Sequence, residues 1–407
     1  MAKKRAISSQ GVEAALNTFN QLPPRLRIAL VVLLVVVGLI LWASGAFKSH
    51  PETHEQAPPE TKTPAEPNPA PGEPDTSPLE NVPPAKAAFR ADSRAVVFCF
   101  WNVENLFDDH ADHRRPPDKD YDDWFAQNAA DREKKYAHLT EIILKMNGGT
   151  GPDILACCEV ESTRAAELLR DSLNAKLPAG VDPYKYVAMK DLDAGRHMAP
   201  CVISRIPIEP GSARLLGSRL RILELRLTGN GHELVLVASH WTSHLSDDGS
   251  DPSKGRAHYA TTIHDFYAAE LKKNPKLDFL LCGDFNDSPS SDAVRNKLLL
   301  TGDARQVTAD ANPPRLYGLL SGRSPRDFGT HYYNEPLIYD HIGISPGLFD
   351  NVGWGCETDS VAVWTEGNSQ TGTKGRRPWR FGNEKDTKFA RGYSDHFPVV
   401  VTLKLAP

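Results

Sequence analysis

Apolar runs of strand length recur between residues 95 and 282 of this 407-residue chain, and stretches with helical spacing separate them. The four runs are residues 95–103, 154–157, 234–239 and 279–282. Continuous apolar runs are typical of strands that are covered on both faces. Three stripes with a spacing of three or four residues predict covering helices near residues 136–146, 166–173 and 259–271, the second capped by Ser162. We therefore expect a mixed α/β domain with helices outside one or two sheets.

Polar side chains stand where these runs stop. Acids, amides and imidazoles appear at six such positions, in the order Asn102 with Glu104, Glu159 with Glu161, His240, Asp284 with Asn286, Asp340 with His341, and Asp395 with His396. Taken alone, each could cap a turn. Together they predict one polar site at a rim of the sheet, which is where open α/β proteins bind their ligands.

The residue types at this predicted rim indicate a chemistry. Oxygen ligands without a cysteine or histidine cluster favour a hard divalent cation, namely Mg²⁺, Mn²⁺ or Ca²⁺. Carboxylates beside histidines suit the activation of water against a phosphoester, because the cation and the imidazoles neutralise the growing negative charge.

Five of these segments, in this order, resemble motifs of the endonuclease/exonuclease/phosphatase superfamily, the deoxyribonuclease I-like fold. The segments are NVENLFD from Asn102, the strand end at Glu159, GDFND around Asp284, YDHI around Asp340 and SDHFPV around His396. The long NVENLFD form, with HWTS from His240, resembles the bacterial extracytoplasmic branch. The resemblance covers residues 96–405. It implies a four-layer α/β sandwich of two packed mixed β-sheets flanked by helices, with the site at one end of the sheets.

The resemblance also implies a metal site and a set of phosphate contacts. Glu159 would be the main carboxylate ligand of Mg²⁺, with Mn²⁺ or Ca²⁺ as alternatives. Asn102 would hold phosphate or a metal-bound water beside it, and Asp395 would touch the metal or accept a hydrogen bond from His396. Arg196 is the candidate for a phosphate contact that relatives make with an arginine-glycine run.

Five further residues receive catalytic roles from the resemblance. Asp284 would orient or deprotonate the attacking water, and Asn286 would contact the scissile phosphate. His240 would contact phosphate and assist the leaving group. His396 would stabilise the pentavalent transition state, and Asp340 would support a histidine. Glu104 and Glu161 are expected to flank the site, and His341 is expected to be structural.

The first 88 residues do not have the pattern of a folded domain. Residues 28–47 form an apolar stretch long enough to span the roughly 30 Å core of a bilayer, and the basic residues lie mainly before it. We expect a cytoplasmic segment (1–27), a transmembrane signal-anchor helix (28–47), a disordered Pro/Glu-rich linker (48–88) and a catalytic domain (89–407) outside the cytoplasm, in the periplasm or at the cell surface. A cleaved secretory signal is the alternative. The six cysteines are expected to be free core thiols, with one disulfide as the alternative.

The substrate class is suggested by one basic segment. The net charge of −5 means that phosphate binding requires a local basic patch or a metal. Residues 374–393 hold seven Lys/Arg against two acids, interleaved with aromatic rings, and Arg377 and Trp379 are candidates for binding substrate. Such a segment can pair with phosphates and stack on bases, or face anionic lipid head groups, or be a solvated loop.

The sequence thus predicts a membrane-anchored, metal-dependent phosphodiester hydrolase that directs water at phosphorus, with nucleic acid as its substrate. A phospholipid, sphingomyelin or inositol-phosphate phosphoesterase is the second hypothesis. A catalytically silent binding module is the third.

Overall fold

The computed structural model describes residues 95–407, apart from residues 112–122, 193–196, 218, 245–250 and 351. The chain divides into two units, Met1–Asn68 and Pro69–Pro407, and every described residue belongs to the second. The expected cytoplasmic segment, anchor helix and linker lie outside the described residues, as does Arg196. Among the described helices, none has the length and apolar character of a membrane span.

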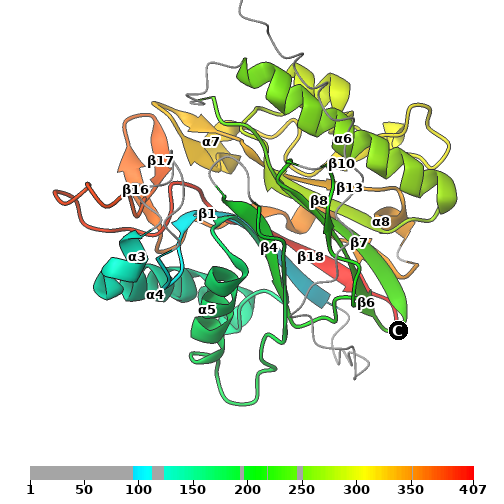
Figure 1. The fold of residues 1–407 in the computed structure, drawn as a ribbon. Helices are drawn as coiled ribbons and strands as arrows, with labels where there is room; N and C mark the ends of the chain where they lie inside the picture. Colours follow the sequence, from blue (N-terminus) through cyan, green and yellow to red (C-terminus); the bar gives the residue numbers. More distant parts are fainter. Residues whose placement is uncertain (1–94, 112–122, 193–196, 218, 245–250, 351) are drawn as a thin grey trace, which may run out of the picture. The chain divides into compact units, whose positions relative to one another are not determined.

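The described strands form two large mixed sheets and two small hairpins (Figure 1). The first large sheet has the order β14-β18-β1-β2-β4-β3, with β15 beside β18, and only its β1 and β2 are parallel. Its strands are β1 (Ala95–Leu106), β2 (Ile154–Val160), β3 (Tyr186–Met189), β4 (Ala199–Ser204), β14 (Trp354–Cys356), β15 (Ala362–Val363) and β18 (Val399–Leu405).

The second large sheet has the order β5-β6-β7-β8-β13-β10-β9, in which β7 with β8 and β9 with β10 are parallel. Its strands are β5 (Arg214–Leu215), β6 (Ile222–Gly229), β7 (His232–His240), β8 (Phe279–Asp284), β9 (Leu300–Thr301), β10 (Leu316–Gly318) and β13 (Asp340–Ile344). The small hairpins pair β11 (His331–Tyr332) with β12 (Pro336–Leu337) and β16 (Ser369–Gly372) with β17 (Gly375–Pro378).

Helices cover the outer faces of the two large sheets. The described α-helices are α3 (Trp124–Gln127), α4 (Ala129–Lys145), α5 (Thr163–Asn174), α6 (Pro252–Lys273), α7 (Pro325–Phe328) and α8 (Gly347–Asp350). Short 3₁₀ turns span Asn147–Gly149, Ala304–Gln306 and Thr358–Ser360, and a π turn spans Ala293–Lys297.

The apolar runs of the sequence account for this layering. Side chains of both sheets, such as Phe98, Leu225 and Leu236, form one buried core between them. The stripes on α4 and α5 bury Leu139 and Leu169 on the other face of the first sheet, and α6 does the same on the second. Each such side chain contributes roughly 1.5–3 kcal/mol by leaving water. The expected pair of mixed sheets is confirmed.

Two smaller predictions are also confirmed. The Ser162 hydroxyl oxygen accepts a hydrogen bond from the Ala165 N–H at 3.1 Å and so caps α5. All six cysteines are free thiols, and five of them are buried.

The register of the strands brings polar residues together at one end of each sheet. In the second sheet, Asp284 on β8 stands opposite His240 on β7 and opposite Asp340 on β13. In the first sheet, Asn102 on β1 stands opposite Cys158 on β2, next to Glu159. Because the two sheets pack face to face, these ends meet.

Candidate active site

Asn102 joins the ends of the two sheets. Its buried side-chain amide donates to Glu159 Oε1 at 3.2 Å and to Asp284 Oδ2 at 3.0 Å. Its oxygen accepts the Glu104 N–H at 3.0 Å. The amide therefore holds two carboxylates from different sheets in one place, although 57 and 182 positions separate them from Asn102 in the sequence.

The buried Asp284 carboxylate is at the centre of this group. Its Oδ2 lies 3.7 Å from His240 Nε2 and 3.7 Å from His396 Nε2. Asn286 donates to it from both its backbone N–H, at 2.8 Å, and its side chain, at 3.3 Å. Burial raises the pKa of Asp284 to about 7, with the positive charge of His396 opposing the rise and the Asp340 charge adding to it.

His396 is held by the carboxylate of Asp340. The His396 Nδ1 lies 2.7 Å from Asp340 Oδ2, and the carboxyl group is fully buried. Burial lowers the pKa of His396, but the Asp340 and Asp284 carboxylates outweigh it and hold the pKa well above the ordinary value of 6.5. The imidazole is therefore an imidazolium at neutral pH, with Nε2 directed at Asp284. The expectation that Asp340 supports a histidine agrees with this geometry.

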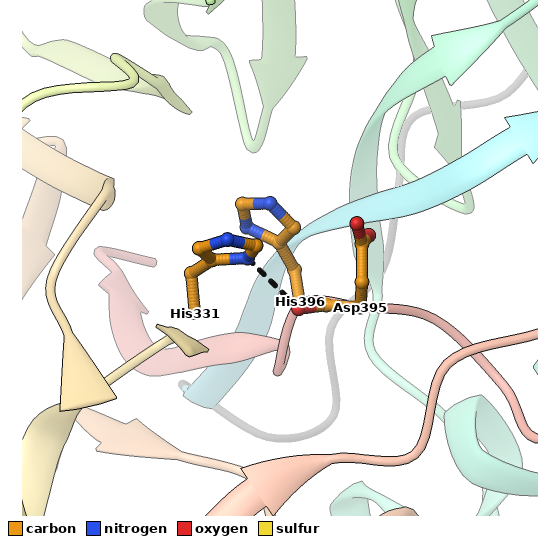
Figure 2. A group of neighbouring side chains, drawn as sticks. All are labelled: His331, Asp395 and His396. Carbon is orange, nitrogen blue, oxygen red and sulfur yellow. Dashed lines mark hydrogen bonds between the residues drawn. The ribbon is translucent and has the colours of Figure 1, made fainter. Parts of the chain in front are cut away.

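Asp395 is not the residue that pairs with Nδ1 of the His396 ring. The partner of that ring is Asp340, whose Oδ2 lies 2.7 Å from His396 Nδ1. Asp395 instead lines the pocket described below. Its carboxylate and one ring nitrogen each of His331 and His396 lie within 4.8 Å of one another (Figure 2).

His331 is a site residue that the sequence did not indicate. Its Nδ1 lies 3.0 Å from the backbone oxygen of Asp395, and its ring lies 4.4 Å from the His396 ring, centroid to centroid (Figure 2). It belongs to the two-residue strand β11, and no apolar run in the sequence predicts that strand. The preceding Thr330 hydroxyl accepts the Asp340 N–H at 3.1 Å and so fixes the start of β13.

Glu159 is partly open to solvent, with 15% of its side chain exposed. Its Oε2 accepts the Asn105 N–H at 3.0 Å, and its backbone has a φ of 60°, a left-handed conformation that is uncommon outside glycine. Its Oε1 lies 3.7 Å from His240 Nε2. Glu159 and Asp395 each offer the hard oxygen atoms that Mg²⁺ prefers, and Asp284, Asp340 and His396 form a further group whose ligand atoms lie within 4.8 Å of one another.

Glu104 connects the first sheet to the basic segment 374–393. Its buried carboxylate accepts the Phe381 N–H at 2.6 Å and the Gly382 N–H at 3.1 Å, and it pairs with Arg380 Nε at 3.2 Å. Burial raises the pKa of Glu104 to about 7, with the Asp395 charge adding to the rise. Glu104 is thus an anchor of this segment as well as a flank of the site.

A pocket of about 400 Å³ opens beside the site, within this basic segment. Arg377 on β17 and the following Trp379 line it, together with Phe389, Tyr332 and Asp395. The Phe389 side chain is 76% exposed. The two candidate substrate residues are therefore brought to the catalytic end of the sheets.

Glu161 and His341 are each close in sequence to a site residue, and both are buried. Glu161 is buried and accepts the Asp108 N–H at 2.7 Å. His341 is buried, stacks on Phe285 at 4.6 Å between ring centroids, and hydrogen-bonds through Nε2 to the Asp287 carbonyl at 2.9 Å. Burial lowers the pKa of His341, so it is a neutral core histidine, in agreement with the structural role expected for it.

Comparisons with known proteins identify a family. The model of the Endonuclease/Exonuclease/phosphatase family matches residues 219–405. A comparison with curated proteins gives no match.

Several solved structures are similar in fold. A family protein from Bacteroides thetaiotaomicron is 14% identical, with 77% of this chain and 98% of that chain covered and a TM-score of 0.44. Sphingomyelinase C from Streptomyces griseocarneus is 14% identical, with coverages of 76% and 99% and a TM-score of 0.45. Truncated TDP2 from Caenorhabditis elegans is 14% identical, with coverages of 77% and 98% and a TM-score of 0.45.

The matched region holds four of the six residue groups that the sequence predicts for the site, namely those of His240, Asp284, Asp340 and His396. The narrower assignment to the extracytoplasmic branch stays a prediction. The resemblance to the superfamily is confirmed: residues 219–405 match the model of the Endonuclease/Exonuclease/phosphatase family.

Proposed function

We propose that this protein is a metal-dependent phosphodiester hydrolase that acts on nucleic acid. Members of its superfamily are metal-dependent phosphoester hydrolases. The observation that carries the proposal is the position of Asp284, whose buried carboxylate lies between two imidazoles and two side-chain amides.

The proton states of the site suit attack by water on phosphorus. With a pKa of about 7, Asp284 accepts a proton from the attacking water near neutral pH. The His396 imidazolium offers its Nε2–H to a phosphoryl oxygen and stabilises the negative charge that grows there. Asn286 and Asn102 hold Asp284 in position and are the amides nearest to an incoming phosphate.

The resident ion would be Mg²⁺, with Mn²⁺ or Ca²⁺ as alternatives. Glu159 and Asp395 would hold it, and Asn102 would add its amide oxygen or bind through water. When bound, the ion supplies positive charge against the phosphoryl oxygens. As oriented here, Asn102 directs its amino group at the carboxylates and its oxygen at the Glu104 N–H, so its first task is to position Glu159 and Asp284.

The pocket beside the site favours nucleic acid as substrate. Trp379 and Phe389 offer ring faces on which a base can stack, which contributes about 1–3 kcal/mol per base, and Arg377 can pair with a neighbouring phosphate. Phospholipid head groups are the second candidate, because the same arginine-rich segment suits an anionic bilayer surface. Arg196 remains a proposed phosphate contact from sequence alone.

The test of function compares substrates and variants of the full chain. We expect Mg²⁺-dependent cleavage of plasmid DNA or RNA, no release from phospholipid vesicles, and no cleavage in EDTA. Glu159→Gln and His396→Ala should each lower the rate about 10²- to 10⁴-fold. The control is Glu224→Gln, because Glu224 is a buried carboxylate on β6 that pairs with Arg214, and this variant should keep its activity.

Three outcomes would count against the proposal. Release of lipid head groups alone would refute the nuclease assignment and support the phospholipid hypothesis. Unchanged rates in both site variants would remove the catalytic assignment. Binding of nucleic acid without any cleavage in Mg²⁺, Mn²⁺ or Ca²⁺ would favour the silent binding module.

We also propose that residues 28–47 anchor the protein in a membrane with its catalytic domain outside the cytoplasm. The apolar length of that stretch and the basic residues before it support this topology. The full chain should stay with the membrane fraction after a carbonate wash, and protease added outside the cytoplasm should digest the domain. Recovery in the soluble fraction would refute the anchor.

A further inference from the structure

Arg221 faces the catalytic histidine of β7. It directly precedes β6, and its backbone oxygen accepts the His240 N–H at 2.9 Å, so the two residues are cross-strand neighbours. Its guanidinium lies across the end of β7, with Nη1 3.2 Å from His240 Nδ1 and Nη2 2.9 Å from the Trp241 carbonyl oxygen. Two parallel contacts of this kind fix the orientation of the imidazole.

The chemistry of the guanidinium decides which nitrogen of His240 carries a proton. A guanidinium has only donors and keeps its charge in proteins. It can bond to Nδ1 only if that nitrogen presents a lone pair, so the ring proton lies on Nε2. This Nε2 lies 3.7 Å from Glu159 Oε1 and 3.7 Å from Asp284 Oδ2, directed into the site.

The two histidines beside Asp284 therefore have opposite kinds of partner at Nδ1. His396 has a carboxylate at Nδ1, which calls for a proton on that nitrogen and favours the imidazolium. His240 has a guanidinium at the same ring position, which excludes a proton on that nitrogen. One ring is a cation and the other is a neutral donor, although both Nε2 atoms lie at the same distance from Asp284 Oδ2.

We propose that Arg221 is a positioning residue that holds His240 as the neutral tautomer with its proton on Nε2. In this state His240 donates a hydrogen bond to a phosphoryl oxygen and keeps its own proton. It does not act as an acid toward the leaving group, in contrast to the role expected from the sequence. It is also not a metal ligand through Nε2, because a ring nitrogen that binds a metal must be unprotonated.

Nitrogen NMR of the full-length protein, labelled at histidine, tests the tautomer directly and without any substrate. At pH 7 we expect His240 Nδ1 to have the chemical shift of an unprotonated ring nitrogen and Nε2 that of a protonated one. Arg221→Met removes the donors and should mix the two tautomers, whereas Arg221→Lys keeps a donor and should preserve the Nε2–H form. A proton on Nδ1 in the wild type would overturn the proposal.

A second arginine variant separates this effect from the general loss of an enclosed arginine. Arg256 is buried, whereas Arg221 is half-buried, and it binds Asp287 at 3.0 Å, with no contact to His240 among the described residues. Arg256→Met should leave the tautomer of His240 unchanged, with thermal unfolding showing whether each variant is folded. A tautomer change of the same size in both variants would assign the effect to general loosening and refute the role of Arg221.

The kinetic consequence rests on the proposed function. Arg221→Met should lower kcat about 10- to 100-fold with little change in KM, and Arg221→Lys should recover most of it. A rise in KM alone, with kcat unchanged, would contradict positioning. If the protein hydrolyses no phosphodiester, the proposed function fails, while the NMR result still decides the tautomer.

Discussion

Replacing Asp340 by Asn would test the electrostatics of the site most fully. The substitution keeps the size of the side chain but removes the charge that lies 2.7 Å from His396 Nδ1. A hydrogen bond to a charged group contributes about 1.5–3 kcal/mol, and one pKa unit corresponds to about 1.4 kcal/mol. We therefore expect the pKa of His396 to fall from its raised value, because the carboxylate that opposes the effect of burial most strongly is gone.

The same change acts on Asp284. The Asp340 charge contributes to the rise of the Asp284 pKa to about 7, so removing that charge lowers this pKa as well. Water activation requires ionised Asp284, and charge stabilisation requires protonated His396. Both limbs of the pH–rate profile should therefore move to lower pH, and the rate at pH 8 should fall about 10- to 100-fold, with a smaller loss at pH 6.

The assay is the pH dependence of kcat/KM for a chromogenic phosphodiester, measured for the wild type, Asp340→Asn and Asp278→Asn. Asp278 precedes the opposite end of β8 from Asp284, about 20 Å away along the strand. It is therefore a control for the loss of a buried carboxylate. A loss in Asp340→Asn that is equal at every pH, or a profile that does not move, would refute the reasoning.

Two further predictions concern stability. Burial raises the pKa of Asp278 to about 7, above its ordinary value of 3.8, so the protonated form stabilises the fold at low pH and this contribution is lost as pH rises through 7. Between pH 5 and pH 8, urea unfolding should show that the wild type loses roughly 3 kcal/mol relative to Asp278→Asn, and parallel curves would contradict this. Glu104→Gln removes the largest of the negative charges that act on the buried Lys135 and weakens the hold on the backbone of Phe381. The variant should lower the free energy of unfolding by about 3–5 kcal/mol and speed proteolysis near residues 379–391. An unchanged digestion rate would refute the role of Glu104 in holding this segment.

The sequence predicted the elements of the site well because the polar residues follow apolar strands. The runs before Asn102, Glu159, His240 and Asp284 are strands in the structure, and their ends meet as expected. This success has a physical basis. A strand that is buried on both faces can expose chemistry only where it leaves the core.

The contacts that tune these residues could not be predicted in the same way. Glu104 binds the backbone of Phe381, which is 277 positions away, and no local pattern encodes that pairing. Arg221 reaches His240 only through the register of a hairpin. His331 belongs to a strand of two residues, too short to leave a periodic signal.

The sequence alone does not decide which carboxylate pairs with the His396 ring. Asp395 and Asp340 were both candidates for supporting a histidine, and Asp395 is the direct neighbour of His396 in the sequence. The structure selects Asp340, which lies 56 positions from His396. The pairing of β8 with β13 brings Asp340 beside Asp284 at the end of the second sheet, and no local pattern around His396 encodes that contact.

The central claim is that one end of the paired sheets is a hydrolytic site, and two identical substitutions near opposite ends of β8 test it. Initial rates of nucleic acid cleavage in Mg²⁺ would be measured for Asp284→Asn and Asp278→Asn in the full chain. The account predicts a loss of about 10²- to 10⁴-fold for Asp284→Asn and a rate near that of the wild type for Asp278→Asn. Equal rates in the two variants would contradict it.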